Sequence, residues 1–248
     1  MSTLKAMGVW ADDVIDRTVA ALAPQADATK AAGAFAYMKG VAPFLGVSAP
    51  DRRRALRQQW HGLPAPTSHQ LGDAALELMG LAEREYHYAA YDLIHRYRLS
   101  ADSRFLRDFG AELLTTKPWW DTVDGLVNAM VSPLMKMWHD DALIDQWSAS
   151  GDRWLIRASI GHQRGWKDAT DVDRVLDLCN AHWENREFFV AKAIGWALRD
   201  LARMDPLAVE HFLAEHSADN RVAIREARRG LDGMSSDRSK TRGGLHQR

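Results

Sequence analysis

The feature that most constrains this fold is the placement of prolines in a chain whose apolar residues follow a helical period. Apolar residues recur at steps of three and four along most of the sequence, as they do on one face of a helix. Alternating runs of Val, Ile or Thr are absent, and so are the hairpin turns that would join them. Pro118, Pro133 and Pro206 each stand where a new helix is expected to begin. The sequence therefore predicts an all-α fold.

The periodic segments and the breaks between them give approximate helix limits. Ser48 is suited to cap a helix whose first turn contains Pro50, and the Leu63–Ser68 segment is a clear break. Helices are expected from residue 48 onward and over about residues 9–23, 27–40, 68–82, 83–98, 102–114, 117–131, 133–148, 152–165, 171–183, 186–204, 206–216 and 219–231.

A weak internal similarity suggests that the sequence contains repeats. Residues 84–86, 153–155 and 186–188 each open an expected helix with an arginine followed by large side chains. Many helices joined by short turns, together with this similarity, predict an α-solenoid of HEAT-like repeats, whose concave face is a binding surface. An irregular helical bundle is the alternative. We expect one repeat domain over residues 1–232 and a disordered basic tail over residues 233–248.

Composition narrows the possible functions. The net charge is −1, with 32 basic and 33 acidic residues, so DNA binding requires that the basic side chains gather on one face. The single cysteine, Cys179, excludes an internal disulfide and a cysteine-based zinc site. No apolar run is long enough to span a membrane, and the first residues do not resemble a signal peptide. We expect a cytoplasmic protein of bacterial type.

The central stretch Thr115–Asp124 contains a lysine, a proline, two tryptophans and two aspartates. Pro118 suits the first turn of a helix, with either threonine before it as the cap. Trp120 and Asp124 then lie one turn apart on the same face, and Trp119 lies about 100° around the helix, towards the core. An interior tryptophan beside a solvated aspartate is one interpretation, and a functional pair is the other.

A second candidate segment is Asp152–Ala158, where Arg153 and Arg157 stand one helical turn apart. Arg157 is about 40 residues from Trp120 and about 40 from Trp196, which is close to the length of a HEAT-type repeat. Residues one repeat apart lie side by side on one face. The spacing therefore allows a shared surface patch, although three unrelated core segments would also explain it.

The third candidate segment is Glu187–Arg199. Lys192, Trp196 and Arg199 run along one helical face. Gly195 costs a helix interior about 1 kcal/mol relative to alanine. We expect a close approach of another backbone to offset this cost.

Other signatures are weaker or missing. The sequence has no dinucleotide-binding, P-loop, zinc-protease or nucleophile-elbow motif. His87 and His95 are expected to serve packing or to lie at the surface. Arg52 and Arg53 belong to an arginine cluster at a helix start, which is either a solvated face or a phosphate contact.

Several motifs together resemble the DNA alkylation-repair glycosylases of the AlkD type. The motifs are residues 36–53, 83–90, 116–124, 154–158 and 187–199. The resemblance implies HEAT-like repeats and cleavage of the N-glycosidic bond of N3- and N7-alkylated purines in duplex DNA, without flipping the base into a deep pocket. It implies no metal or other cofactor.

The resemblance also assigns roles to residues. It implies that Asp124 is the catalytic carboxylate, that Trp120 and Trp196 flank the lesion, and that Arg157 holds a phosphate. We expect further DNA contacts from Arg52, Arg53, Lys117, Arg153, Lys192 and Arg199. The partner would be double-stranded DNA that contains alkylated purines, bound by a monomer in the bacterial nucleoid. The alternatives are a relative that binds DNA without excision and a HEAT-type protein scaffold.

Overall fold

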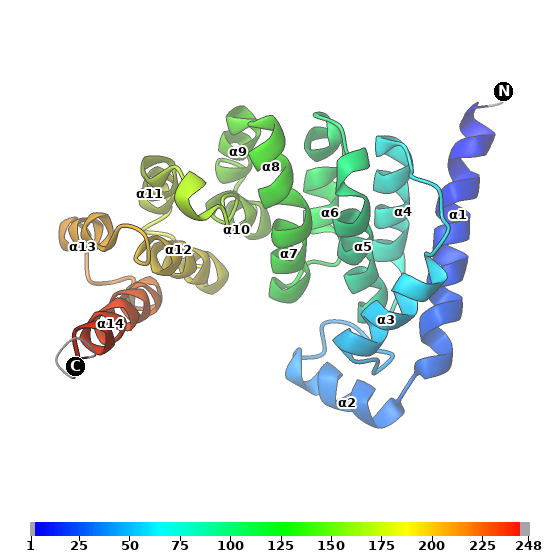
Figure 1. Ribbon diagram of the computed structural model, residues 1–248, viewed down its shortest axis with the longest axis horizontal. Helices are drawn as coiled ribbons and strands as arrows, with labels where there is room; N and C mark the ends of the chain where they lie inside the picture. The colour runs from blue at the N-terminus through cyan, green and yellow to red at the C-terminus, as the bar shows by residue number, and fades with distance from the viewer. Residues whose placement is uncertain (1–2, 244–248) are drawn as a thin grey trace. The chain divides into compact units, whose positions relative to one another are not determined.

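The computed structural model describes the backbone of residues 3–243 and the side chains of residues 9–233. These residues form helices and turns and no strand (Figure 1), which confirms the all-α fold. The chain divides into two compact units, Met1–His139 and Asp140–Arg248. A single repeat domain over residues 1–232 stays a prediction. None of the helices in the described part combines the length and apolar character needed to cross a membrane.

Unit 1 is built around the pair α4 and α5, with α1 packed against α4 and α7 against α5. Its α-helices are α1 (Thr3–Leu22), α2 (Ala28–Tyr37), α3 (Ala49–Gln59), α4 (Ser68–Gly80), α5 (Arg84–Tyr97), α6 (Ala111–Thr115), α7 (Trp120–Leu126) and α8 (Ser132–Trp138). The short elements are the 3-10 turns η1 (Ala23–Gln25) and η2 (Arg98–Ser100) and the π-helical turns η3 (Leu106–Gly110) and η4 (Val127–Val131).

The loop before α3 is held by one buried carboxylate. Glu85 accepts hydrogen bonds from the backbone N–H groups of Leu45, Gly46 and Val47 at 2.8, 2.8 and 3.1 Å. Gly46 has φ +85°, and a Cβ there would lie 2.2 Å from the carbonyl oxygen of Asp27. Only glycine fits this position. The loop thus fixes where α3 begins and where its arginines lie.

Two proline-based expectations have opposite outcomes. Pro206 opens α13, as expected, and the structure shows that Asp205 caps this helix. Pro133 does not start a separate helix, because α7, η4 and α8 form one continuous run from Trp120 to Trp138. The π turn η4 precedes Pro133 and accommodates the missing N–H within the run. The expected helix over 133–148 is therefore wrong, since the break falls at His139, whose φ is +49°.

The start of α7 also differs from the expectation. Pro118 and both threonines before it lie outside the helix, which begins at Trp120. Lys117 has φ +44°, and Trp119 is extended, with φ −153° and ψ 167°. Trp119 is half-buried, as Trp120 is, so its assignment to the core is wrong. The prediction that Trp119 lies about 100° around the helix from Trp120 does not apply, because Trp119 is not part of the helix.

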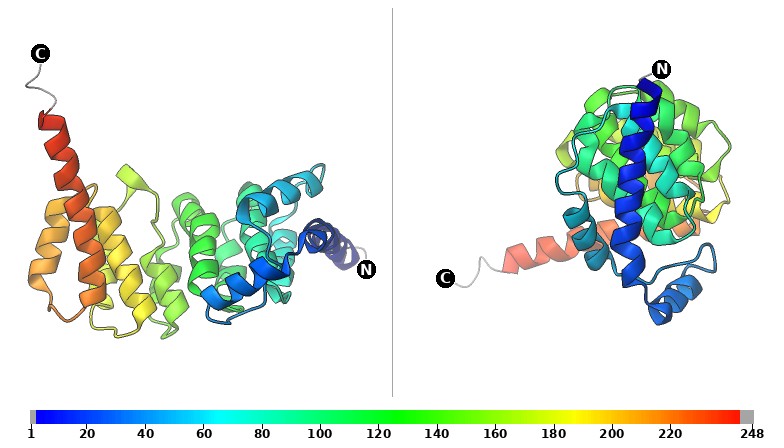
Figure 2. Two further views of the ribbon diagram at one scale, coloured as in Figure 1. Left: turned by 90° about the horizontal axis from the view of Figure 1, so that it is seen from below. Right: turned by 90° about the vertical axis from the view of Figure 1, so that its right-hand side faces the viewer.

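Unit 2 contains α9 (Asp141–Ser148), α10 (Arg153–Ile160), the 3-10 turn η5 (Lys167–Ala169), α11 (Val172–Ala181), α12 (Phe188–Leu201), α13 (Pro206–Glu215) and α14 (Arg221–Gly243). Helix α12 lies against α10 and, most extensively, α14. The end of α14 projects beyond α12 and α13 (Figure 2). It is helical past Gly233, where the sequence places the start of a tail. The disorder of the tail stays a prediction, and residues 244–248 lie outside the described residues.

Gly195 brings α12 close to α14. A Cβ at this position would lie 2.7 Å from the Cβ of Glu226 and 3.0 Å from both the Cα and the carbonyl oxygen of Ala223. The expected close approach of another backbone is therefore present. This close packing explains why glycine, which has low helix propensity, occupies position 195 inside α12.

We predict that Gly195→Ala lowers the free energy of unfolding by about 1–3 kcal/mol, because overpacking against α14 outweighs the gain in helix propensity. Urea unfolding would measure this change. Gly33→Ala on α2 is the matched control, since nothing lies within 4 Å of a Cβ there. It should leave stability unchanged or raise it by up to about 1 kcal/mol. Equal stabilisation by both substitutions would contradict the packing argument.

Candidate functional site

A groove of about 830 Å³ in unit 1 contains the expected pair from α7. Trp120 and Asp124 both line it and both are half-buried. Their helical spacing therefore does place them on one face, as the sequence predicts. The other lining residues come from α3 and the residue after it, α5, α7 and η4: Arg53, Leu56, Arg57, Trp60, Tyr91, Asp92, His95, Arg96, Asp121, Gly125, Asn128 and Ala129.

The same groove has a wall rich in arginine. Arg53 and Arg57 on α3 and Arg96 on α5 are exposed and line it, as does His95. The Nε of Arg53 lies 3.6 Å from a carboxylate oxygen of Asp92. The sequence singles out Arg53 but misses Arg57 and Arg96. Their helical periodicity on α3 and α5 is the signal that could have placed them on one wall.

Arg52 does not belong to this exposed wall. Its side chain is 2% exposed, its Nε lies 3.1 Å from a carboxylate oxygen of Asp92, and its guanidinium packs on the rings of Tyr88 and Tyr91. This placement does not fit the phosphate contact that the sequence predicts for Arg52. The side chain instead ties α3 to α5.

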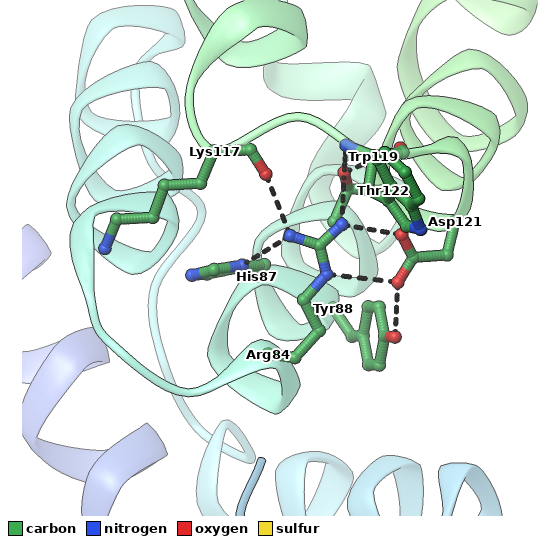
Figure 3. A network of polar contacts seen from close by, with 7 residues as sticks. All are labelled: Arg84, His87, Tyr88, Lys117, Trp119, Asp121 and Thr122. Atoms are coloured by element: carbon green, nitrogen blue, oxygen red, sulfur yellow. Dashed lines mark hydrogen bonds and ion pairs between the residues drawn. The ribbon is translucent and has the colours of Figure 1, made fainter. Parts of the chain in front are cut away.

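Beneath α7, a buried arginine organises a polar network (Figure 3). Arg84 is 1% exposed and holds Asp121 through two parallel hydrogen bonds, from Nε at 3.1 Å and from a terminal nitrogen at 2.6 Å. The same guanidinium donates to the carbonyl oxygen of Lys117 at 2.8 Å and to the hydroxyl of Thr122 at 3.1 Å. Paired, two-point contacts of this kind are strong and directional. They fix the first turn of α7, and with it Trp120.

The network continues to His87 and Tyr88 on α5. The Nε2 of His87 donates to the carbonyl oxygen of Leu81 at 2.8 Å, so its Nδ1 accepts from Arg84 at 3.3 Å. Burial lowers the pKa of His87 to about 4, and the ring is therefore neutral at pH 7. Burial and the neighbouring Asp121 raise the pKa of Tyr88 well above its usual value, which keeps its hydroxyl as a donor to Asp121.

Tyr91 forms part of the groove floor next to the catalytic candidate. Burial raises the pKa of its hydroxyl to about 12. Its ring packs directly on Gly125, where an added Cβ would lie 2.4 Å from a ring carbon. Gly125 thus lets α5 approach α7 one residue after Asp124.

Lys117 is exposed, but its ammonium is engaged. The Nζ donates to the carbonyl oxygens of Gly80 and Leu81 at the end of α4. A cation at the C-terminal end of a helix donates hydrogen bonds to its last free carbonyl groups and interacts favourably with the helix dipole. The contact holds the Lys117 turn in place, and DNA binding by Lys117 stays a prediction.

In unit 2, four cations surround the indole of Trp196, and we call them the Trp196 cation cluster. They are Arg157, Arg164, Lys192 and Arg199, at 5.0, 4.9, 5.7 and 5.7 Å from the ring centroid. Cations at such distances are attracted by the ring face. The arrangement of Lys192 and Arg199 beside Trp196 is the one that the sequence predicts, whereas Arg164 was missed because it lies in a loop.

One buried carboxylate organises part of this cluster. Glu226 on α14 is 1% exposed and pairs with Lys192 at 2.9 Å, Arg199 at 3.3 Å and Arg229 at 2.8 Å. Burial acts to raise the pKa of Glu226, but the hydrogen bonds and charges of Lys192 and Arg229 outweigh it and lower the pKa. No sequence motif indicates Glu226, since Lys192 and Arg199 lie on another helix, α12.

Arg157 is buried rather than exposed. Its side chain is 3% exposed, and it donates to the carbonyl oxygen of Phe189 at 2.7 Å. The direct phosphate contact that the resemblance implies does not fit this burial. Arg153, one turn earlier, is half exposed, pairs with Glu187 at 3.2 Å and lies over the ring of Trp154.

The structure thus brings Trp120 together with Asp124 in unit 1, and Arg157 together with Trp196 in unit 2. A single patch shared by all four residues stays a prediction. Half of the ten tryptophans serve packing, because five are buried in the two cores: Trp10, Trp60, Trp147, Trp154 and Trp183.

Comparison with known proteins identifies the family. A family model described as DNA alkylation repair enzyme matches residues 18–231. The chain belongs to this family. A solved structure described as "Predicted DNA alkylation repair enzyme from Enterococcus faecalis" is 28% identical, with a TM-score of 0.71, and the match covers 82% of this chain and 94% of that chain. No curated protein matches the sequence. The resemblance noted in the sequence is confirmed at the level of the family.

We predict that Asp121→Asn lowers the free energy of unfolding by about 3–5 kcal/mol, because it leaves the buried guanidinium of Arg84 without its counter-charge. Urea unfolding at pH 7 would measure this change. Asp108→Asn removes a carboxylate that pairs with the exposed Arg104 at 3.7 Å, and it should cost at most about 1 kcal/mol. Similar small losses in both variants would show that the Arg84–Asp121 pair does not stabilise unit 1.

We predict that His87 makes stability depend on pH. Its pKa is lowered from 6.5 to about 4 on folding, so the unfolded chain binds the extra proton between these values. The stabilisation is complete above pH 6.5 and is lost as the pH falls towards 4. From pH 7 to pH 5 the wild type should lose about 2 kcal/mol more than His87→Gln, measured by urea unfolding. Parallel pH profiles would contradict this assignment.

Proposed function

We propose that the protein is a DNA glycosylase that removes positively charged N3- and N7-alkylated purines from duplex DNA. The observation that carries the proposal is the groove of unit 1, which holds the carboxylate of Asp124 one helical turn from the indole of Trp120. Family membership supports a role in repair of alkylated DNA. The exposed arginines of the groove wall support a polyanionic ligand.

The reaction requires little help from the protein to make the alkylated purine a leaving group. An alkylated purine with a formal positive charge leaves as a neutral base when it takes the electron pair of the C1′–N bond. The deoxyribose becomes cationic as this bond breaks, and a carboxylate near C1′ stabilises that charge. Asp124 performs this role, orients the attacking water, and accepts the proton that the water releases.

Trp120 supplies the second element of the mechanism. The face of an indole attracts positive charge, so it stabilises both the alkylated base and the sugar cation. Because the first turn of α7 is fixed by Arg84 and Asp121, the indole and the carboxylate keep their spacing without rearrangement. A carboxylate that is already held in position stabilises the transition state more than one that must first be oriented.

We predict that Asp124→Asn lowers the rate of release of 7-methylguanine or 3-methyladenine from methylated duplex DNA by about 100-fold or more. The released base would be measured by chromatography and corrected for spontaneous loss. Asp108→Asn is the matched control, because Asp108 does not line the groove, and it should retain the wild-type rate.

Two outcomes would overturn the proposal. One is a wild-type rate no higher than spontaneous depurination of the same DNA. The other is an Asp124→Asn variant that releases base as fast as Asp108→Asn does. A protein that binds the duplex without release would instead match a DNA-binding relative that lacks excision activity.

A further inference from the structure

Asn128 is a polar side chain of the unit 1 groove that has no role in the mechanism above. It belongs to the π turn η4, in which the other four residues are apolar and buried. Asn128 itself is exposed and lines the groove. Within the described part of the chain, its amide has no hydrogen-bond partner from the protein. Both its N–H donors and its oxygen are therefore available to a ligand.

Trp120, Asp124 and Asn128 follow one another along the continuous run from α7 into η4. Each stands four residues after the one before it, and all three line the groove. Side chains at this spacing are neighbours on a helix, with Cβ atoms about 5–6 Å apart. The amide of Asn128 thus lies one turn beyond the carboxylate of Asp124, on the side away from Trp120. Turns of π-helix such as η4 are frequent at functional sites.

Helix α5 closes the groove behind these side chains. The ring of Tyr91 packs on Gly125, so α5 and α7 meet one residue after Asp124. Helix α5 also packs against η4. His95, one turn after Tyr91, is exposed and lines the groove too. Because the helices meet behind Asp124, a ligand approaches Asp124 and Asn128 from the same open side.

The geometry of duplex DNA determines which atoms of a purine come near Asn128. The proposed mechanism puts the carboxylate of Asp124 beside C1′ of the alkylated nucleotide. In a duplex, C1′ adjoins the minor-groove edge of its base, which carries N3 and, in guanine, the 2-amino group. A side chain one helical turn from the carboxylate is within reach of that edge. An asparagine amide matches it, since its N–H donates to N3 and its oxygen accepts from the 2-amino group.

We propose that Asn128 binds the minor-groove edge of guanine and so favours N7-alkylguanine over N3-alkyladenine as the substrate. The inference rests on the proposed function, because it takes C1′ to lie at Asp124. An N7 adduct leaves N3 and the 2-amino group of guanine free. In an N3 adduct the alkyl group occupies N3, and adenine has no 2-amino group. Asn128 therefore makes both hydrogen bonds to the first base and neither to the second.

The hydrogen bond to N3 gains strength as the reaction proceeds. When the C1′–N9 bond breaks, its electron pair passes into the purine ring, and N3 shares it through C4. A donor at N3 therefore binds the departing base more strongly than it binds the intact nucleotide. A bond that strengthens in this way raises the rate and not only the affinity. No proton leaves Asn128, and the proton of the attacking water still passes to Asp124.

The test compares the rates at which the full chain releases 7-methylguanine and 3-methyladenine from the same methylated duplex. Asn128→Ala should lower the rate for 7-methylguanine about tenfold, and leave that for 3-methyladenine unchanged or raised. Gln58→Ala is the matched control, because Gln58 is an exposed amide on α3 that does not line the groove. It should keep the wild-type ratio of the two rates. Loss of folded protein lowers both rates together, so the ratio reports the contact with the base.

A change in the substrate tests the same contact from the other side. 7-Methylhypoxanthine carries the same N7 adduct but lacks the 2-amino group. Relative to 7-methylguanine, its release should fall more with the wild type than with Asn128→Ala. Equal falls, or an Asn128→Ala variant with the wild-type ratio of 7-methylguanine to 3-methyladenine release, would overturn the inference and leave the proposed function intact. A wild type that releases neither base above the spontaneous rate would overturn both.

Discussion

The candidate site of unit 1 depends on the buried ion pair between Arg84 and Asp121. Helix α7 begins without a side-chain cap from the residue before it, Trp119, so local sequence alone does not fix its start. The guanidinium of Arg84 replaces that local signal with a tertiary one, since it binds the Asp121 carboxylate, the Thr122 hydroxyl and the carbonyl of Lys117 together. A buried pair of this kind stabilises little by itself but strongly disfavours alternative arrangements that would leave either charge unpaired.

Much of the fold follows from the sequence, because helical periodicity and caps are local properties. The cap of α3, the start of α13 at Pro206 and the close packing at Gly195 are present as expected. The failures have two different causes. The rule for proline predicts a helix start at Pro133 because it assumes a regular α-helix, and the π turn η4 removes that assumption. The start of α7 depends instead on non-local contacts with Arg84 of α5.

The site could be predicted in part for the same reason. Spacing along one helix is enough to bring Asp124 beside Trp120. It cannot say how deeply an arginine is buried, because burial depends on partners far away in the chain. Arg52 is covered because Asp92 and the α5 tyrosines meet it, and such a buried arginine looks the same in sequence as an exposed one. A loop residue such as Arg164 belongs to no helical pattern, so the sequence does not indicate which aromatic ring its side chain will contact.

The near-neutral charge of the chain is compatible with DNA binding when the positions of its carboxylates are considered. Asp92, Asp121 and Glu226 have side chains that are 17%, 10% and 1% exposed, and each is paired with arginine or lysine. These acids orient cations and aromatic rings from beneath, while Arg53 and Arg57 remain at the surface of the groove. A net charge counts both kinds of group equally, but a phosphate responds mainly to the exposed ones, because screening by water and salt differs with depth. Asp92 and Asp121 line the groove as Asp124 does. We assign the catalytic role to Asp124 in our proposal because it lies one helical turn from Trp120 on the same face of α7, while the carboxylates of Asp92 and Asp121 are engaged by buried arginines.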